Sequence, residues 1–421
     1  MTESRGAKEV LVAGMIAAAS MIAAAMPAFG DESKPDPNAM TVRWKDGLRI
    51  ETADKKTQVR IGGRIQSDWA FFREDDEISD GFGVIEDGTE FRRARLFASG
   101  LINGLIEFKD EFEFSGGRVQ TRDVYIGLRG LPAVGTLRVG HFKEPLSLEE
   151  LTSDSYVALQ ERSLVSTFVP SRNPGAVVMN AFADERVTAA AGVFRDADNT
   201  GNQSGDGEYA VTARVTGLPA IRDDGKALVH LGAAASVRSP NDDMARYRAR
   251  PEANLAPYLV DTGEDGLPAE SVTILAGEAA VVRGPLALQA EHVGALVSGI
   301  DDNEDLAFWG TYVQATWWLT GESANYQRAE GVFGGVTPAK KFSLEDDGAG
   351  AWQLAARYSH LSLEDGSVLG GNLSDVTLGL NWYLSAITRV TANVVVAERS
   401  DAEGGVEGRV TSILTRMQVD F

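Results

Sequence analysis

Residues 59–72 read VRIGGRIQSDWAFF, and this stretch decides the fold class of the chain. Apolar side chains recur there at alternate positions, and polar side chains or glycines occupy most of the positions between them. Because successive side chains of a β-strand point to opposite faces, this period of two predicts a strand with one apolar face. Residues 309–319 and 375–385 repeat the pattern. The apolar positions of the first stretch are Val59, Ile61, Ile65, Trp69 and Phe71.

Sixteen segments of this kind follow one another along the chain, with turn residues between them. Roughly ten residues per segment is the length that a tilted membrane strand requires. An even count also places both ends of a barrel on the same side of the membrane. The chain is therefore predicted to be all-β, a sixteen-stranded antiparallel transmembrane β-barrel. The segments begin near Val59, Thr89, Leu105, Val119, Gly135, Ala176, Val187, Tyr209, Leu228, Ser271, Pro285, Ala307, Ala351, Leu373, Thr388 and Gly408.

The N-terminal 30 residues differ from the rest in composition. A short polar start precedes an apolar run at residues 10–25 and small residues that end at Gly30. This order predicts a secretory signal peptide over residues 1–30. An uncleaved membrane anchor is the alternative, although the run is shorter than the ~20 residues of a spanning helix. Residues 31–58 are then expected to be a periplasmic segment, and residues 59–421 the barrel domain.

Composition excludes several classes of function. The 421 residues carry a formal net charge of -21, contain no cysteine and include four histidines. Such a charge disfavours nucleic acid as a partner, and the lack of cysteine excludes disulfides and cysteine-based sites. No HExxH motif occurs, and the scattered histidines suggest no catalytic triad. We therefore expect no enzyme, no catalytic residues and no cofactor. An outer-membrane hydrolase remains the alternative.

Two acidic stretches of the sequence are candidates for metal sites. Residues 196–208 alternate carboxylates with glycines, but the twelfth position, where a calcium loop needs glutamate, is Gly207. Residues 301–305 read DDNED and could bridge lipopolysaccharide through divalent ions. An acidic surface loop explains each stretch equally well. The sequence therefore predicts no specific metal site, while outer-membrane lipid and lipopolysaccharide are expected surroundings.

Connection lengths support a barrel. Bacterial barrels keep the turns at the periplasmic end short and the loops at the external end long. With the first strand running outward, residues 103–104, 131–135, 183–186, 283–285 and 385–387 form short periplasmic links, and external links such as residues 144–175 are long. Residues 320–350 depart from the rule, because they fall at the periplasmic end. Either a hairpin or another ordered feature is expected there.

The period of two also assigns a direction to each charge. A lysine or arginine at the lipid midplane costs ~2–4 kcal/mol, so charged side chains should face a water-filled lumen. Residues 88–100 read GTEFRRARLFASG. The alternation predicts that Arg93 and Arg95 face inward, and that Arg92 lies on the lipid face near a membrane interface. Asp110 also falls on an apolar face, which requires a bulge or a protomer interface. The same test turns Arg60, Arg64, Lys109, Arg129, Arg138, Arg357 and Arg416 inward.

Aromatic residues complete the outer-membrane pattern. The chain ends TRMQVDF, and a last strand that closes on an aromatic residue resembles the signal of outer-membrane barrel assembly. Tryptophans commonly mark the membrane interfaces. Trp69, Trp317, Trp318 and Trp382 are therefore expected on the lipid side. Together with export, these features predict a location in the bacterial outer membrane.

Seven motifs resemble those of the phosphate-selective porin O and P family. The resemblance runs from about Val42 to Phe421, and its most specific part is the last pair of motifs, which flank the long periplasmic link. The motifs are RIGGRIQSDWAFF, FRRARLFASG, DVYIGL, VGHFKEPLSLEELTS, QERS, LTGESANYQRAEGVFGGVTP and GAWQLAARYSHLSL.

The resemblance implies a homotrimer of sixteen-stranded barrels. In each barrel the third external loop, here residues 144–175, would fold into the pore as a constriction. The family also implies arginines that lead to lysines near this point, for which Arg162, Arg172 and Lys143 are the candidates at the loop, with Lys109 in the lumen. The same loop is acidic, since it contains Glu144, Glu149, Glu150, Asp154 and Glu161.

These features predict a porin for passive diffusion of small anions, phosphate or related oxyanions. Stacked guanidinium groups in a narrow lumen attract anions, and arginine binds phosphate oxygens in pairs. The acidic loop favours an alternative, a general-diffusion porin without phosphate specificity. The arginines could instead pair with lumenal carboxylates and only stiffen the wall. A structural or adhesive surface barrel, plugged by its own loop and without conductance, is the second alternative.

Overall fold

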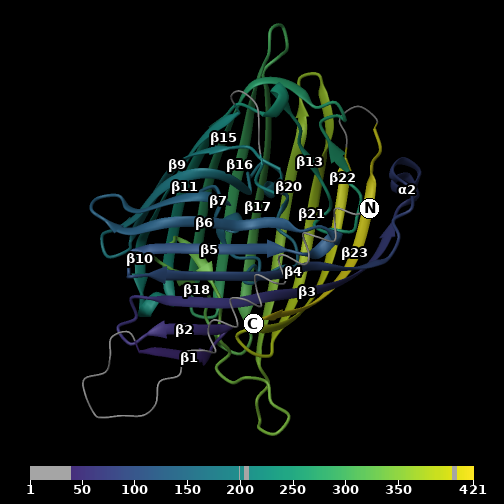
Figure 1. Ribbon diagram of the computed structural model, residues 1–421. Coiled ribbons are helices and arrows are strands. Elements are labelled where there is room, and N and C mark those ends of the chain that lie inside the picture. Colours follow the sequence, from purple (N-terminus) through teal and green to yellow (C-terminus); the bar gives the residue numbers. More distant parts are fainter. Residues whose placement is uncertain (1–38, 199, 203–207, 401–404) are drawn as a thin grey trace, which may run out of the picture.

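A closed barrel of sixteen antiparallel strands forms the body of the molecule, as predicted (Figure 1). The computed structural model describes residues 39–421 except 199, 203–207 and 401–404. The barrel strands are β3 (Gln58–Glu74), β4 (Gly88–Ile102), β5 (Ile106–Glu113), β6 (Gln120–Leu131), β7 (Gly135–Lys143), β8 (Arg172–Phe182), β9 (Val187–Arg195), β10 (Tyr209–Arg222), β11 (Ala227–Arg238), β15 (Leu267–Arg283), β16 (Leu286–Gly299), β17 (Leu306–Trp318), β20 (Ala351–Asp365), β21 (Val368–Tyr383), β22 (Thr388–Ser400) and β23 (Gly408–Asp420).

The ring closes between the last strand and the first. Strand β23 pairs antiparallel with β3, from Val410 opposite Glu74 to Asp420 opposite Arg64. Two backbone hydrogen bonds extend the closure to the C-terminal residue: Gly63 N–H donates to the Phe421 carbonyl at 2.7 Å, and Phe421 N–H donates to the Gly63 carbonyl at 3.0 Å. Closure leaves no barrel strand with an open edge.

A hairpin precedes the barrel. Strands β1 (Met40–Trp44) and β2 (Leu48–Thr52) pair with each other, and β2 pairs with the first residues of β3 (Figure 1). The sheet therefore continues beyond the barrel at the end where both described termini lie. The predicted signal peptide, residues 1–30, lies outside the described residues.

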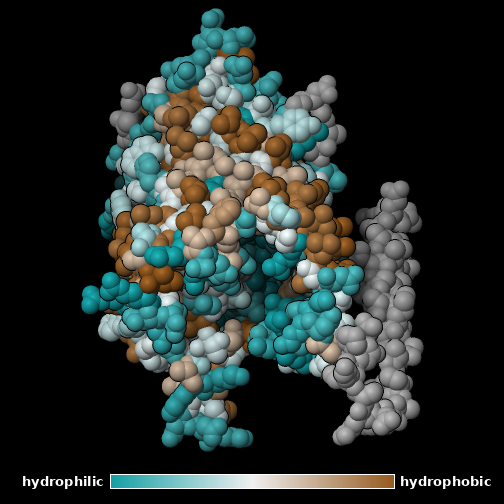
Figure 2. Space-filling view, turned by 90° about the vertical axis from the view of Figure 1, so that its left-hand side faces the viewer, coloured by the Kyte–Doolittle hydropathy of each residue, from teal (hydrophilic) through white to brown (hydrophobic). Residues whose placement is uncertain are grey.

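The alternation of apolar and polar side chains is confirmed along the strands. In β17, Trp309 and Trp317 face outward with 41% and 49% of their surface exposed, whereas Tyr312 is fully buried inside. Apolar residues gather over the middle of the face shown in Figure 2, and hydrophilic residues gather toward its two ends. This distribution matches a membrane-facing band between two aqueous ends.

In the part of the chain that the structure describes, no helix has both the length and the apolar character needed to cross a membrane.

Two of the side chains predicted on the lipid face lie inside. Trp318 is 3% exposed and packs inside against Tyr383, as the alternation requires for the residue that directly follows the outward-facing Trp317. Arg92 was also predicted on the lipid face, which is wrong. The pairing of β3 with β4 passes from Gln66 opposite Arg93 to Ser67 opposite Phe91, so Arg92 is the extra residue of a β-bulge. The bulge lets Arg92 and Arg93 both reach interior carboxylates.

Asp110 lies on the outer face of β5 and is exposed. The pairing of β5 with β6 shifts register directly after it, between Asp110 and Phe112. A bulge was one of the two explanations that the sequence required for this residue. The irregularity is present, yet it leaves the carboxylate on the outside.

The links differ in length at the two ends of the barrel. Three segments matter for the interior: loop 3 (residues 144–171) and loop 5 (residues 239–266) at the far end, and the near-end segment (residues 319–350) at the end of the C-terminus. Loop 3 ends four residues earlier than predicted, because residues 172–175 already pair with β7. The near-end segment contains a hairpin of β18 (Asn325–Gln327) and β19 (Val332–Gly334), which accounts for its unusual length.

Closure of the ring between β23 and β3 predicts that a larger side chain at Gly63 is not tolerated. A Cβ atom at Gly63 would lie 2.6 Å from the Arg95 carbonyl oxygen and 2.6 Å from the Phe421 ring. Gly63→Val should therefore destabilise the barrel by about 1–3 kcal/mol, the usual cost of overpacking. Gly277→Val in β15 is the control, because a Cβ there meets nothing within 4 Å. The urea midpoint and the heat-dependent gel mobility of the folded barrel measure the difference, and equal midpoints would contradict the expectation.

Candidate functional site

Loop 3 contacts the inner wall on the side of the barrel away from its own strands. It contains the short helices α3 (Leu148–Leu151) and η2 (Leu164–Thr167). Three carbonyl groups of the loop accept hydrogen bonds from the wall: Ala158 from Asn381 at 2.7 Å, Val157 from Arg389 at 2.7 Å, and Gln160 from Arg416 at 2.6 Å. Because these donors come from β21, β22 and β23, the loop is fixed to strands far around the ring from β7 and β8.

A carboxylate of the wall holds the start of helix α3. Leu148 N–H and Glu149 N–H donate to the two carboxylate oxygens of Glu291 at 2.9 and 2.7 Å. Tyr312 O–H donates to the same carboxylate at 2.7 Å. Unpaired N–H groups at a helix start favour a negative group, so Glu291 satisfies donors that would otherwise be buried without partners.

Loop 5 also enters the polar interior, which the sequence did not predict. Glu252 is 4% exposed, and its carboxylate accepts from Arg357 at 2.6 Å and from Thr377 at 2.7 Å. Burial raises the pKa of Glu252, against the opposing effect of the Arg357 guanidinium. Asn254 donates to the Glu90 carboxylate of β4 at 2.9 Å. Loop 5 therefore joins β4 to strands β20 and β21 across the far end.

The near-end segment reaches loop 3 from the opposite end. Its Gly331 carbonyl accepts from Arg214 of β10 at 2.8 Å, and the Tyr326 hydroxyl lies 2.5 Å from His230 Nδ1 of β11. Val332 packs in one apolar cluster with Leu148 of loop 3 and Ala280 of β15. Loop 3 therefore contacts both other segments: the near-end segment through Leu148 and Val332, and loop 5 through the rings of Phe168 and Tyr247, whose centroids lie 5.0 Å apart.

The structure places most of the predicted basic residues in ion pairs. The exception is Arg60, which donates to the Asp46 carbonyl at 2.9 Å and lies over the Phe97 ring at 5.0 Å. The other pairs, with N–O distances, are Arg64–Asp420 2.7 Å, Arg93–Asp154 3.1 Å, Arg95–Glu113 2.7 Å, Lys109–Asp123 2.6 Å, Arg129–Glu107 3.8 Å, Arg138–Glu107 2.9 Å, Lys143–Glu150 3.2 Å, Arg162–Glu150 3.0 Å, Arg172–Asp123 2.6 Å, Arg357–Glu252 2.6 Å and Arg416–Asp68 2.6 Å. Carboxylates from the wall and from the loops thus balance these charges locally.

Four of the predicted residues border one large cavity. Lys109, Arg129, Arg138 and Lys143 line a space of about 600 Å³ against strands β5 to β9. Arg214 is a fifth basic residue of this lining, and Glu107, Asp123 and Glu330 are its acidic residues. Five positive and three negative groups give the lining a net charge of plus two. This cavity is here called the basic cavity.

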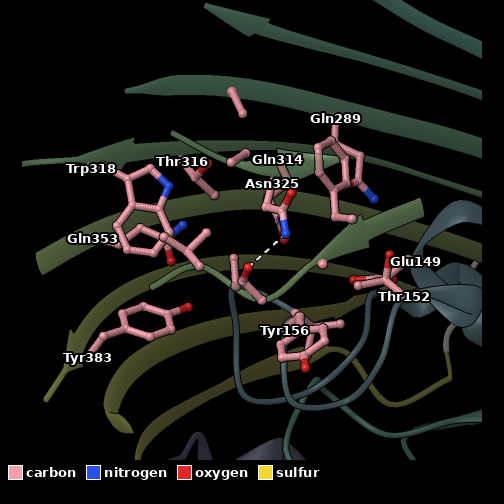
Figure 3. A pocket seen from close by; sticks show the side chains of 18 residues that line it. Glu149, Thr152, Tyr156, Gln289, Gln314, Thr316, Trp318, Asn325, Gln353 and Tyr383 are labelled. Carbon is pink, nitrogen blue, oxygen red and sulfur yellow. Dashed lines mark hydrogen bonds between the residues drawn. The ribbon is translucent and has the colours of Figure 1, made fainter. Parts of the chain in front are cut away.

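A second, smaller cavity is almost uncharged. It measures about 70 Å³ and lies between loop 3, the near-end segment and strands β16 to β21 (Figure 3). The lining residues labelled in Figure 3 carry mainly amide, hydroxyl and aromatic side chains, and Glu149 is the one carboxylate among them. Asn325 donates to the Gly335 carbonyl at 2.9 Å at its edge. The near-end segment thus narrows this side of the interior.

Three buried arginines of the strands were not among the predicted residues. Arg214 pairs with Glu278 at 2.6 Å, Arg238 pairs with Glu144 of loop 3 at 2.8 Å, and Arg389 donates to the Val157 carbonyl and, at 3.1 Å, to the Tyr383 hydroxyl. All three occupy inward positions of alternating strands, so the alternation test applied to every strand would have found them. The contacts of loop 5 could not be predicted in this way, because the sequence of a loop has no repeating pattern that shows which side chains share a face.

Among residues 39–421, apart from the short gaps, no group of three or more histidine or acidic side chains is arranged to hold a metal ion. The predicted site residues that the structure brings together are therefore basic groups and their carboxylate partners. Such an arrangement can attract and orient ions, and its chemistry is electrostatic.

Comparison with known proteins gives the family. The family model described as phosphate-selective porin O and P matches residues 59–421. The chain belongs to this family. It is similar to Porin O of Pseudomonas aeruginosa, with 26% identity over 452 residues that cover 97% of this chain and 98% of that protein.

Solved porins share the fold of this family member. An anion-selective porin from Comamonas acidovorans superposes with a TM-score of 0.53 at 15% identity and covers 87% of this chain and 100% of its own. A trimer form of OmpT from Vibrio cholerae has a TM-score of 0.51 at 13% identity, with 86% and 99% covered. Family and fold place the chain among the channels of the bacterial outer membrane.

The ion pair of Arg416 should be important for stability. Its guanidinium is buried and meets Asp68 at 2.6 Å and Glu161 at 2.9 Å. Arg416→Met would leave the buried Asp68 carboxylate without this partner and the partly buried Glu161 with Arg92 alone, at a cost of about 3–5 kcal/mol.

Arg409→Met, on the same strand, is the matched control. Its pair with Glu398 is exposed, with 56% and 57% of the two side chains accessible, so the loss should be about 0–1 kcal/mol. Urea unfolding of both variants tests the contrast. Similar midpoints would show that burial does not decide the strength of these pairs.

Proposed function

We propose that this porin conducts small anions, with phosphate or related oxyanions among them. The observation that carries the proposal is the basic cavity, whose lining holds five basic and three acidic groups. A charged lining of low-dielectric walls concentrates ions of opposite sign. The family description and the anion-selective porin from Comamonas acidovorans support the same sign of selectivity.

Loop 3 is proposed to fold into the pore and form its narrowest part. Its hydrogen bonds to β21, β22 and β23 support this position, and so does its apolar contact with the near-end segment. Ions would then pass on the side of the basic cavity, between loop 3 and strands β5 to β9. Of the twelve predicted basic residues, Lys109, Arg129, Arg138 and Lys143 are proposed to line this path. Arg357 and Arg416 are buried on β20 and β23, and they are proposed to hold the loops against the wall.

A general-diffusion porin is the second candidate. The observation in its favour is the local balance of charge, since eleven of the twelve predicted basic residues have a carboxylate within 4.0 Å. Phosphate at millimolar concentration should reduce chloride current through an oxyanion channel. A pore without such a site should show no block.

The assembly is proposed to be a homotrimer in a lipopolysaccharide-containing membrane, and the channel is proposed to act without catalysis. The trimer form of OmpT supports the stoichiometry. An interface between protomers would also cover Asp110, which is exposed on the apolar outer face of β5. Native mass spectrometry of the purified protein tests the stoichiometry, and a monomer would contradict it.

The basic cavity predicts how selectivity should change. Lys109→Gln and Arg138→Gln together remove two of its five basic groups. The permeability ratio of chloride to potassium should fall by roughly twofold or more, because the local ion concentration follows the potential. Reversal potentials across a planar bilayer in a KCl gradient measure this ratio.

Lys226→Gln is the matched control, because Lys226 is exposed in the turn between β10 and β11. It should leave the ratio unchanged. A cation-selective unmodified channel would overturn the proposed function, and an unchanged ratio in the double variant would remove the basic cavity from the ion path.

A further inference from the structure

Four arginines surround one carboxylate of loop 3. Asp154 Oδ2 lies 3.1 Å from Arg93 Nε, 3.0 Å from Arg95 Nη1 and 3.9 Å from Arg64 Nη1. The other oxygen, Oδ1, accepts a hydrogen bond from Arg162. Because the arginines come from β3, β4 and loop 3, three separate segments of the chain converge on a single negative group.

The charges of this arginine cage depend unequally on Asp154. Arg95 also pairs with Glu113, Arg64 with Asp420, and Arg162 with Glu150. Asp154 is the one carboxylate within 4.0 Å of Arg93 among the described residues, and the second partner of Arg93 is the neutral Gln66 at 2.7 Å. Removal of the carboxylate would therefore leave at least the Arg93 charge unbalanced.

The arginine cage, formed by Arg64, Arg93, Arg95 and Arg162, is buried around Asp154 and partly exposed at its edge. Asp154 is 4% exposed, while the side chains of Arg64 and Arg162 keep 15% and 14% of their surface accessible. Burial raises the pKa of Asp154, but Arg93, Arg162 and Arg95 lower it by more, and the net pKa lies well below its usual value. The carboxylate is thus ionised at neutral pH, and it accepts hydrogen bonds from Arg95 and Arg162.

Guanidinium groups bind carboxylate and phosphate oxygens through the same paired hydrogen bonds. A cage that satisfies one carboxylate on both oxygens offers the donors that a free oxyanion needs. The Asp154 carboxylate is attached to the chain beside these arginines, so it competes with a free anion at an effective concentration of millimolar or more. Free phosphate at millimolar concentration would therefore meet a site that is already filled.

We propose that Arg64, Arg93, Arg95 and Arg162 form an oxyanion site in which Asp154 is the resident anion, so that Asp154 sets how tightly this channel binds phosphate. The inference rests on the proposed function, because it concerns the ligand of the same channel. It makes Asp154 a specificity-determining residue: with the carboxylate in place the channel passes anions with weak binding, and without it the cage binds phosphate.

Asp154→Ala tests the proposal, since it removes the charge and makes room for an ion. Inorganic phosphate should block the chloride current of this variant at a concentration roughly tenfold lower than the concentration that blocks the unmodified channel. This is the change expected when phosphate gains charge-assisted hydrogen bonds from the arginines. Asp154→Asn removes the charge but keeps the volume, so its block should lie between the two. Asp261→Ala is the control, because Asp261 pairs with Arg246 at the surface of loop 5.

The outcomes separate the two proposals. An unmodified channel that selects cations would overturn the proposed function. An anion-selective channel whose phosphate block is unchanged in Asp154→Ala and Asp154→Asn would overturn this inference alone. Heat-dependent gel mobility reports whether each variant folds. Loss of the folded barrel in both variants would also overturn the inference, because Asp154 would then be needed to hold the arginines together.

Discussion

Every backbone N–H and C=O group that crosses a bilayer must find its partner within the protein. Lipid offers no hydrogen bonds, so a set of strands can cross only as a closed ring. The pairing of β23 with β3 meets this requirement, and the alternation of side chains follows from it. One face of each strand must suit lipid, which leaves the other face as the place for charge.

Charge inside the ring is dense because it is balanced. Arg416 lies between Asp68 and Glu161, and Arg357 lies between Glu149 and Glu252, so each of these buried guanidinium groups has carboxylates on two sides. A buried ion costs several kcal/mol unless it is paired. Loop 3 and loop 5 supply three of these four carboxylates, so the same contacts that neutralise the wall also attach the loops to it. Selectivity must then arise where the balance is incomplete, as in the basic cavity.

The sequence predicted the strands well and the interior poorly, for one physical reason. A strand has a period, and a period shows which side chains share a face, as for Trp309 and Trp317 in β17. The prediction failed at Arg92, where a bulge breaks the period without any local signal. It also failed at Trp318, which was assigned to lipid as a tryptophan although the period of β17 turns it inward. Contacts of loop 3 and loop 5 with distant strands depend on the closed ring itself. Residues such as Glu252 can be placed only once that ring exists.

Loop 3 also has a consequence for the order of folding. Ala158 bonds to Asn381, which lies 223 positions later, and Gln160 bonds to Arg416, which lies 256 positions later. Contacts between residues so far apart form late, because the intervening chain must first be ordered. Loop 3 can make these bonds only once β21, β22 and β23 are in place. The wall of this part of the barrel must therefore form before loop 3 can settle against it.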